Sequence, residues 1–176
     1  MTGLEPASAV FLASAVVLGV AGVAKALKPA DTSRALHIAG LPDRPWMVRS
    51  GGAAELAVAV FAVALPGALT GAVVACSYAS FAVFVAVALR RGWPLSSCGC
   101  FGRPDSRPGL AHLVLNLAAT AGACWWAADP PAGGWRIVDD QSWDGIALLV
   151  VTLVVAELAY LVWTRPARSL AVDTSA

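Results

Sequence analysis

Two cysteines one residue apart, Cys98 and Cys100, are the strongest chemical signal in this sequence. They lie in the short segment from Ser96 to Gly102, between two long apolar stretches. Because Gly99 has no Cβ, the backbone between the two thiols can turn tightly enough to close a small disulfide ring. A strained and exposed disulfide is easily reduced, so the pair suggests thiol–disulfide exchange. Half of a metal site and two unreactive loop cysteines are the alternatives.

The elements that must hold these cysteines are membrane-spanning helices. The chain has 176 residues, of which 59% are hydrophobic and only 13% charged, and its mean hydropathy is +0.73. Such a composition lies outside the range of soluble domains. Five apolar runs approach or exceed the ~18 residues that a helix needs to cross a bilayer. We therefore predict an all-α integral membrane bundle with spans at 7–27, 51–65 (extended forward by Trp46, Met47 and Val48), 69–89, 110–128 and 146–163.

The basic residues give an expected orientation, because Lys and Arg gather on the cytoplasmic side of membrane helices. With five spans, eleven of the twelve Lys and Arg residues fall on the side of the C-terminus and the Cys98–Cys100 loop, and only Arg136 falls on the other. No Lys or Arg precedes Lys25, so the first span lacks the basic start of a signal peptide and should be retained. We expect a multi-pass protein of the plasma membrane with its N-terminus outside.

This orientation conflicts with the chemistry of the cysteine pair. Stable disulfides belong to oxidising compartments, whereas the cytosol keeps thiols reduced. Either the pair acts as a reductant or relay at the inner face, or the number of spans differs by one. The net charge of +1 gives no sign of a nucleic-acid partner.

Several ionisable or polar residues lie inside the expected spans, at similar depth and on the side of the cysteines. Such groups in membrane helices normally face the bundle interior and pair there. Lys25 and Glu55 are the natural couple, although Lys25 could instead extend to the bilayer surface. We predict one polar pocket beneath the cysteines, with specification of helix packing as the alternative role for the same residues. Its candidate members are Lys25, Glu55, His112, Asn116 and Glu157.

Such a pocket suits a dithiol because the thiolate is the reacting form of cysteine. Lys25 or a protonated His112 would stabilise a thiolate, and a carboxyl group could accept or return protons. Cys100 is nearer to the positive N-terminal end of the span at 110–128, so we expect it to be the attacking thiol. A closed zinc site would need two ligands besides the thiolates, and only His112, His37 and carboxylates are at hand. We predict no metal site.

Two further features concern the elements around the pocket. Asp31, Thr32 and Ser33 offer an N-cap for a short amphipathic helix that Gly40 closes. Cys76 and Cys124 both fall in the outer half of the membrane, and the sequence leaves open whether they form a second pair.

Several motifs together resemble one known family. They are Gly22-Val23-Ala24-Lys25, Gly40-Leu41-Pro42, Glu55 and above all Ser97-Cys98-Gly99-Cys100-Phe101-Gly102. These residues are similar to those of the methylamine utilisation protein MauE family, which belongs with the DoxX-like small membrane proteins. Asn116 matches an asparagine of the family pattern, whereas Leu115 stands where that pattern often has arginine.

The resemblance spans about residues 7–128 and implies the organisation of the chain. It implies a MauE/DoxX-like four-helix membrane domain at 1–128 with the Cys-Gly-Cys loop at 96–102. We expect an acidic outer loop at 129–145, an additional transmembrane helix at 146–163 and a flexible tail at 164–176.

The resemblance also implies a role in maturing methylamine dehydrogenase by handling its disulfides, or a related electron-transfer task on the periplasmic side. The expected function is a membrane thiol–disulfide redox protein, a possible oxidoreductase. Besides the lipid bilayer, its partner would be a redox protein or a maturing dehydrogenase subunit, with a quinone as a possible second substrate. The alternative is a non-catalytic membrane scaffold or a metal-binding module that uses the Cys98–Cys100 loop.

Overall fold

The computed structural model describes residues 6–95 and 109–130 together with residues 154 and 156, and this part of the chain is helical with short connections. Its helices are α1 (Pro6–Leu27), α2 (Ala30–Ile38), α3 (Pro45–Ala64), α4 (Ala68–Arg91) and α5 (Leu110–Ala128). All but α2 are long and apolar enough to cross a membrane. The predicted all-α membrane bundle is confirmed, with four spans in the described residues.

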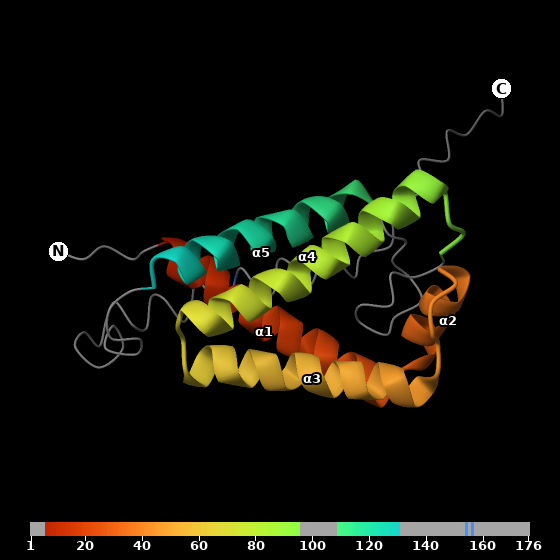
Figure 1. Cartoon of the computed structure of the whole chain (residues 1–176), viewed down its shortest axis with the longest axis horizontal. Helices are drawn as coiled ribbons and strands as arrows, with labels where there is room; N and C mark the ends of the chain where they lie inside the picture. The colour runs from red at the N-terminus through yellow and green to blue at the C-terminus, as the bar shows by residue number, and fades with distance from the viewer. Residues whose placement is uncertain (1–5, 96–108, 131–153, 155, 157–176) are drawn as a thin grey trace, which may run out of the picture.

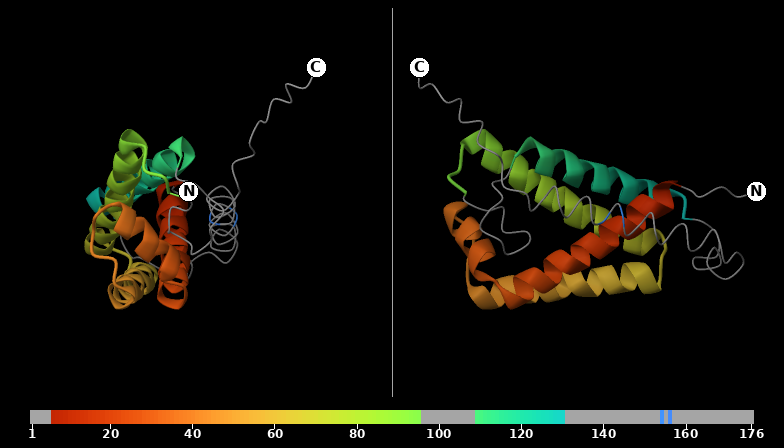
Figure 2. Two further views of the ribbon diagram at one scale, coloured as in Figure 1. Left: turned by 90° about the vertical axis from the view of Figure 1, so that its right-hand side faces the viewer. Right: turned by 180° about the vertical axis from the view of Figure 1, so that it is seen from behind.

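The four long helices run alternately in opposite directions, as short connections between them require. α1 packs most closely on α3 and α4 on α5, while α1 also contacts α5. Figure 1 shows the α1–α3 pair below and the α4–α5 pair above, with α2 lying across the end where α1 and α4 finish. Figure 2 gives the view along the bundle from this side, which we call the α2 end.

Proline and glycine set the ends of these helices. Pro45 occupies the first turn of α3, where its missing N–H costs nothing. Gly92 ends α4 in the left-handed conformation at φ 60°, and Trp93 N–H donates to Ala88 O across this turn. The expected N-cap at residues 31–33 is wrong. α2 starts at Ala30, directly after Pro29, and no side chain caps it, because residues 31–33 already lie within the helix.

The main core lies between α1, α3, α4 and α5. Phe11 of α1 stacks on Trp126 of α5 with ring centroids 4.6 Å apart. Tyr78 of α4 donates its hydroxyl hydrogen to the backbone oxygen of Ser14, a buried bond of 2.7 Å that ties α4 to α1. In the stretch from Cys76 to Ser80, only Tyr78 is fully buried.

A smaller core fixes α2 to the rest of the bundle. Ala35 of α2 packs with Ala88 of α4 and with Leu95, the last described residue before the cysteine segment. The predicted fifth span at 146–163 lies outside the described residues except for Val154 and Ala156. Both are helical, and Ala156 belongs to the main core.

Candidate functional site

The site begins with a close crossing of α1 and α3 at two glycines. A Cβ on Gly22 would lie 2.6 Å from the backbone oxygen of Gly52, and a Cβ on Gly52 would lie 2.6 Å from that of Gly22. Only residues without a side chain allow this approach, as is common where membrane helices pack. Lys25 and Glu55 each lie three residues after the glycine of their own helix, so the crossing brings these two side chains together.

The two charges form a buried ion pair. Lys25 Nζ lies 2.5 Å from Glu55 Oε1 and donates a hydrogen bond to it. Lys25 is only 6% exposed, and the side chain of Glu55 only 16%. Extension of Lys25 to the bilayer surface, the alternative that the sequence allowed, is therefore wrong. The pairing expected from the sequence is present instead.

An aromatic side chain that sequence reasoning missed completes the environment of the pair. Nζ of Lys25 lies 4.4 Å from the centroid of the Phe81 ring on α4, well within the range of a cation–π contact. Tyr78, one turn earlier, meets Phe81 edge to face with centroids 6.0 Å apart. No local pattern marks Phe81 among the other aromatic residues of α4, so only the tertiary structure identifies it.

One oxygen of the pair is left without a partner among the described residues. Glu55 Oε2 is buried and accepts no hydrogen bond there. A buried carboxylate oxygen of this kind is costly to maintain, and it is chemically competent to accept a proton or a donor from a ligand. The ion pair therefore provides a fixed positive charge next to a proton-accepting atom.

His112 and Asn116 lie on α5, near the same end of the bundle. Both are buried, and Asn116 Nδ2 donates to the backbone oxygen of His112 at 2.7 Å. His112 Nε2 is buried without a hydrogen-bond partner in the described part of the chain. They share one face of α5, as their spacing predicted, but no direct bond joins them to the Lys25–Glu55 pair.

Cys98, Cys100 and Glu157, the remaining candidates, lie outside the described residues. The residues that flank the cysteine segment are described. Leu95 packs against α2, and Gly109 precedes the first turn of α5, so both flanks lie at the α2 end. Lys25, two residues before the end of α1, belongs to the same end.

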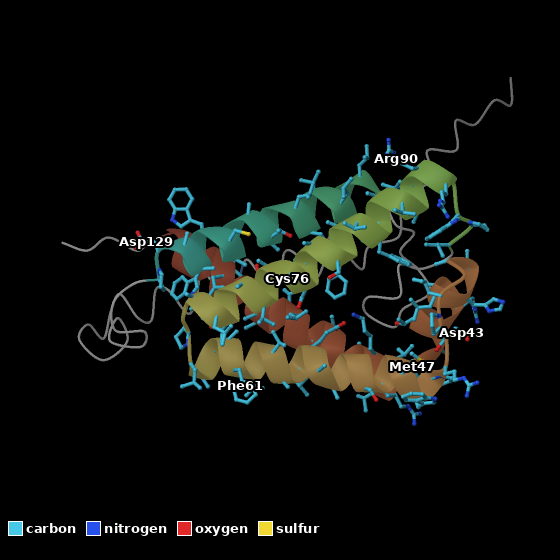
Figure 3. All side chains as sticks on the ribbon, in the orientation of Figure 1. Asp43, Met47, Phe61, Cys76, Arg90 and Asp129 are labelled. Atoms are coloured by element: carbon cyan, nitrogen blue, oxygen red, sulfur yellow. The ribbon has the colours of Figure 1, made fainter. Side chains whose placement is uncertain are left out.

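Cys76 and Cys124 are both free and exposed, so no disulfide joins them. Figure 3 shows Cys76 on α4, nearer to the start of the helix than to its end. Within the residues that the structure describes, no three His, Cys, Asp or Glu side chains are arranged to hold a metal ion.

A family model, methylamine utilisation protein MauE, matches residues 5–129. The chain belongs to the MauE family. Neither the curated proteins nor the solved structures contain a significant match. The MauE match and the four long apolar helices together make this a multi-pass membrane protein.

The MauE match covers the ion pair, the cysteine segment and the polar residues of α5, whereas Glu157 lies beyond it. Helices α1 to α5 therefore correspond to the family region, and residues 146–163, where we predicted an additional span, lie outside the match.

Proposed function

We propose that this protein is a membrane thiol–disulfide redox protein in which Cys98 and Cys100 cycle between dithiol and disulfide. In one direction, a thiolate of the pair attacks a disulfide of the partner, and the second thiol resolves the mixed disulfide. The partner then leaves with two thiols while the pair becomes a disulfide, so two electrons and two protons move together. The family name points to methylamine utilisation, and the partner that we propose is a maturing dehydrogenase subunit of that process.

The observation that supports this proposal best is the buried Lys25–Glu55 pair at the end of the bundle where the cysteine segment starts and finishes. Ionisable residues inside a membrane are expensive, and by default they mark a functional site. Lys25 is held by Glu55 and Phe81, so its charge is fixed in place. Glu55 Oε2 and His112 Nε2 have no hydrogen-bond partner among the described residues, and they could exchange the protons released or taken up by the thiols.

The proposed sidedness follows from the basic residues. All seven Lys and Arg residues in the described part of the chain lie at the α2 end. By the positive-inside rule this end is cytoplasmic, and the cysteine segment would work from the inner face. A membrane-impermeant thiol reagent applied to intact cells tests this directly. If Cys98 or Cys100 is labelled before the cells are opened, the cysteine segment lies outside the cell and the proposed orientation is wrong.

The glycine crossing favours a second candidate function. Lys25 and Glu55 are enclosed where α1 and α3 touch, so the pair could serve only to specify helix packing in a non-catalytic scaffold. The two functions differ in what the cysteines do.

Serine substitution separates them. Cys98→Ser and Cys100→Ser should each abolish thiol–disulfide exchange with the partner, measured by trapping the redox state of both proteins with a maleimide. Cys76→Ser and Cys124→Ser are matched controls, because these two exposed thiols lie on α4 and α5. Both control variants should keep the wild-type rate of thiol–disulfide exchange with the partner. If Cys98→Ser and Cys100→Ser both exchange at the wild-type rate, the redox function is refuted and the scaffold function is supported.

A further inference from the structure

An open apolar groove runs along the outer side of the α1–α3 pair. It encloses about 700 Å³, within the range of small-molecule binding sites. Its lining is almost entirely apolar. Its lining residues Val20, Val23, Leu56 and Val60 are themselves exposed, so the groove opens on the outside of the bundle. The residues that shape the groove include Gly19, Val20, Val23, Leu56, Val60 and Val63.

Two cations lie where this groove reaches the α2 end. Lys28 follows the lining residue Ala24 by four residues, and its N–H donates to Ala24 O at 2.8 Å, so it continues the same face of α1. Arg49 precedes the lining residue Leu56 by seven residues, or two helical turns, on the same face of α3.

The register of the crossing sets these two cations at the same level. A Cβ on Gly52 would lie 2.9 Å from the backbone nitrogen of Ala26, and the helices are antiparallel. Moving about two residues further along α1 and three back along α3 brings Lys28 opposite Arg49. Both side chains are exposed, and neither forms an ion pair with a described residue.

The combination fits one class of ligand. A hydrocarbon chain suits a long apolar groove in the wall of a membrane protein. Two cations without an acidic partner among the described residues suit a negatively charged phosphate group at the bilayer surface. We propose that the α1–α3 groove binds an anionic phospholipid, with one acyl chain along the groove and the phosphate between Lys28 and Arg49. This site is separate from the proposed redox site, because Lys25 and Glu55 face the interior of the bundle.

Native mass spectrometry of the full chain tests the proposal. The protein is released from micelles that contain phosphatidylglycerol and phosphatidylcholine with identical acyl chains, and the ratio of the two bound lipids is measured. The wild type should retain phosphatidylglycerol preferentially. The double variant Lys28→Gln/Arg49→Gln should lose this preference, by roughly fivefold for each cation removed.

A matched control is the double variant Arg90→Gln/Arg91→Gln, which removes two exposed cations from the same end of the bundle on α4. It should keep the wild-type preference. An equal loss in this control would mean a general attraction of anionic lipid to the α2 end and would overturn the site.

The groove itself is tested by Val20→Phe, whose larger side chain would fill it. Val20 is already 45% exposed, so this variant should fold, and Val83→Phe on the exposed face of α4 is the control. We expect Val20→Phe to reduce retention of both lipids. Unchanged retention, or displacement of the lipid by inorganic phosphate alone, would each refute the proposal. The proposal would also be refuted if a quinone displaced the bound lipid equally well from the wild type and from the Lys28→Gln/Arg49→Gln variant.

Discussion

Removal of one partner of the Lys25–Glu55 pair should destabilise the bundle far more than removal of both. At 2.5 Å and an effective dielectric constant of about 20, the attraction between two unit charges reaches at most about 7 kcal/mol. Part of this attraction offsets the desolvation of both groups, and loss of one partner of a buried pair typically costs about 3–5 kcal/mol. Lys25→Met also loses the contact with Phe81, worth about 0.5–2 kcal/mol.

The double variant Lys25→Met/Glu55→Leu leaves two apolar side chains at the crossing and no unpaired charge. Replacement of a buried ion pair by apolar residues is often close to neutral, so we expect a loss of about 0–2 kcal/mol. The double-mutant cycle should therefore give a coupling energy of at least about 3 kcal/mol.

The assay is reversible unfolding in mixed micelles by titration with a denaturing detergent, followed by far-UV circular dichroism. Arg90→Met is the control, because this exposed arginine near the end of α4 forms no ion pair with a described residue, and its loss should change stability by less than about 0.5 kcal/mol. Additive single effects, within about 0.5 kcal/mol, would show that the two charges do not stabilise each other.

Two other variants test the contacts that hold the helices together. Gly52→Val should cost about 1–3 kcal/mol and separate α1 from α3, since its Cβ would lie 2.6 Å from a backbone oxygen. Gly51→Val, with open space around the new Cβ, is the control in the same unfolding assay. Tyr78→Phe should cost about 1 kcal/mol through loss of the buried bond to Ser14, whereas Ser80→Ala, exposed on α4, should have little effect. If Gly52→Val is as stable as Gly51→Val, the close approach of the two helices does not contribute to stability. If Tyr78→Phe is as stable as Ser80→Ala, the bond to Ser14 does not contribute either.

The double variant Lys25→Met/Glu55→Leu also bears on function. If it folds and its cysteines exchange at the wild-type rate, the pair specifies packing. A large loss of exchange in this stable variant would support a chemical role for the two charges in the reaction of the cysteines.

The sequence alone determined the membrane spans and the family. Hydropathy over a window is a local property, so the residues of α1, α3, α4 and α5 predict their own helices without knowledge of the partners. Pro29 and Gly92, which end helices through their backbone geometry, are equally readable. The motif around Cys98 and Cys100 predicted the family that the comparison then confirmed.

The tertiary structure decided which polar side chains meet. Lys25 could have reached the bilayer surface, and it is buried because Gly22 and Gly52 let two backbones approach until Glu55 comes within hydrogen-bond distance. The position of Phe81 over the same lysine depends on how α4 rotates against α1. These contacts join residues 30 and 56 positions apart, and helix rotation and crossing depend on the packing of all the helices at once. Local sequence periodicity does not determine the rotation of a helix or its crossing with another helix. The Lys25–Glu55 pair could therefore be predicted from its two charges, whereas the contact with Phe81 could not.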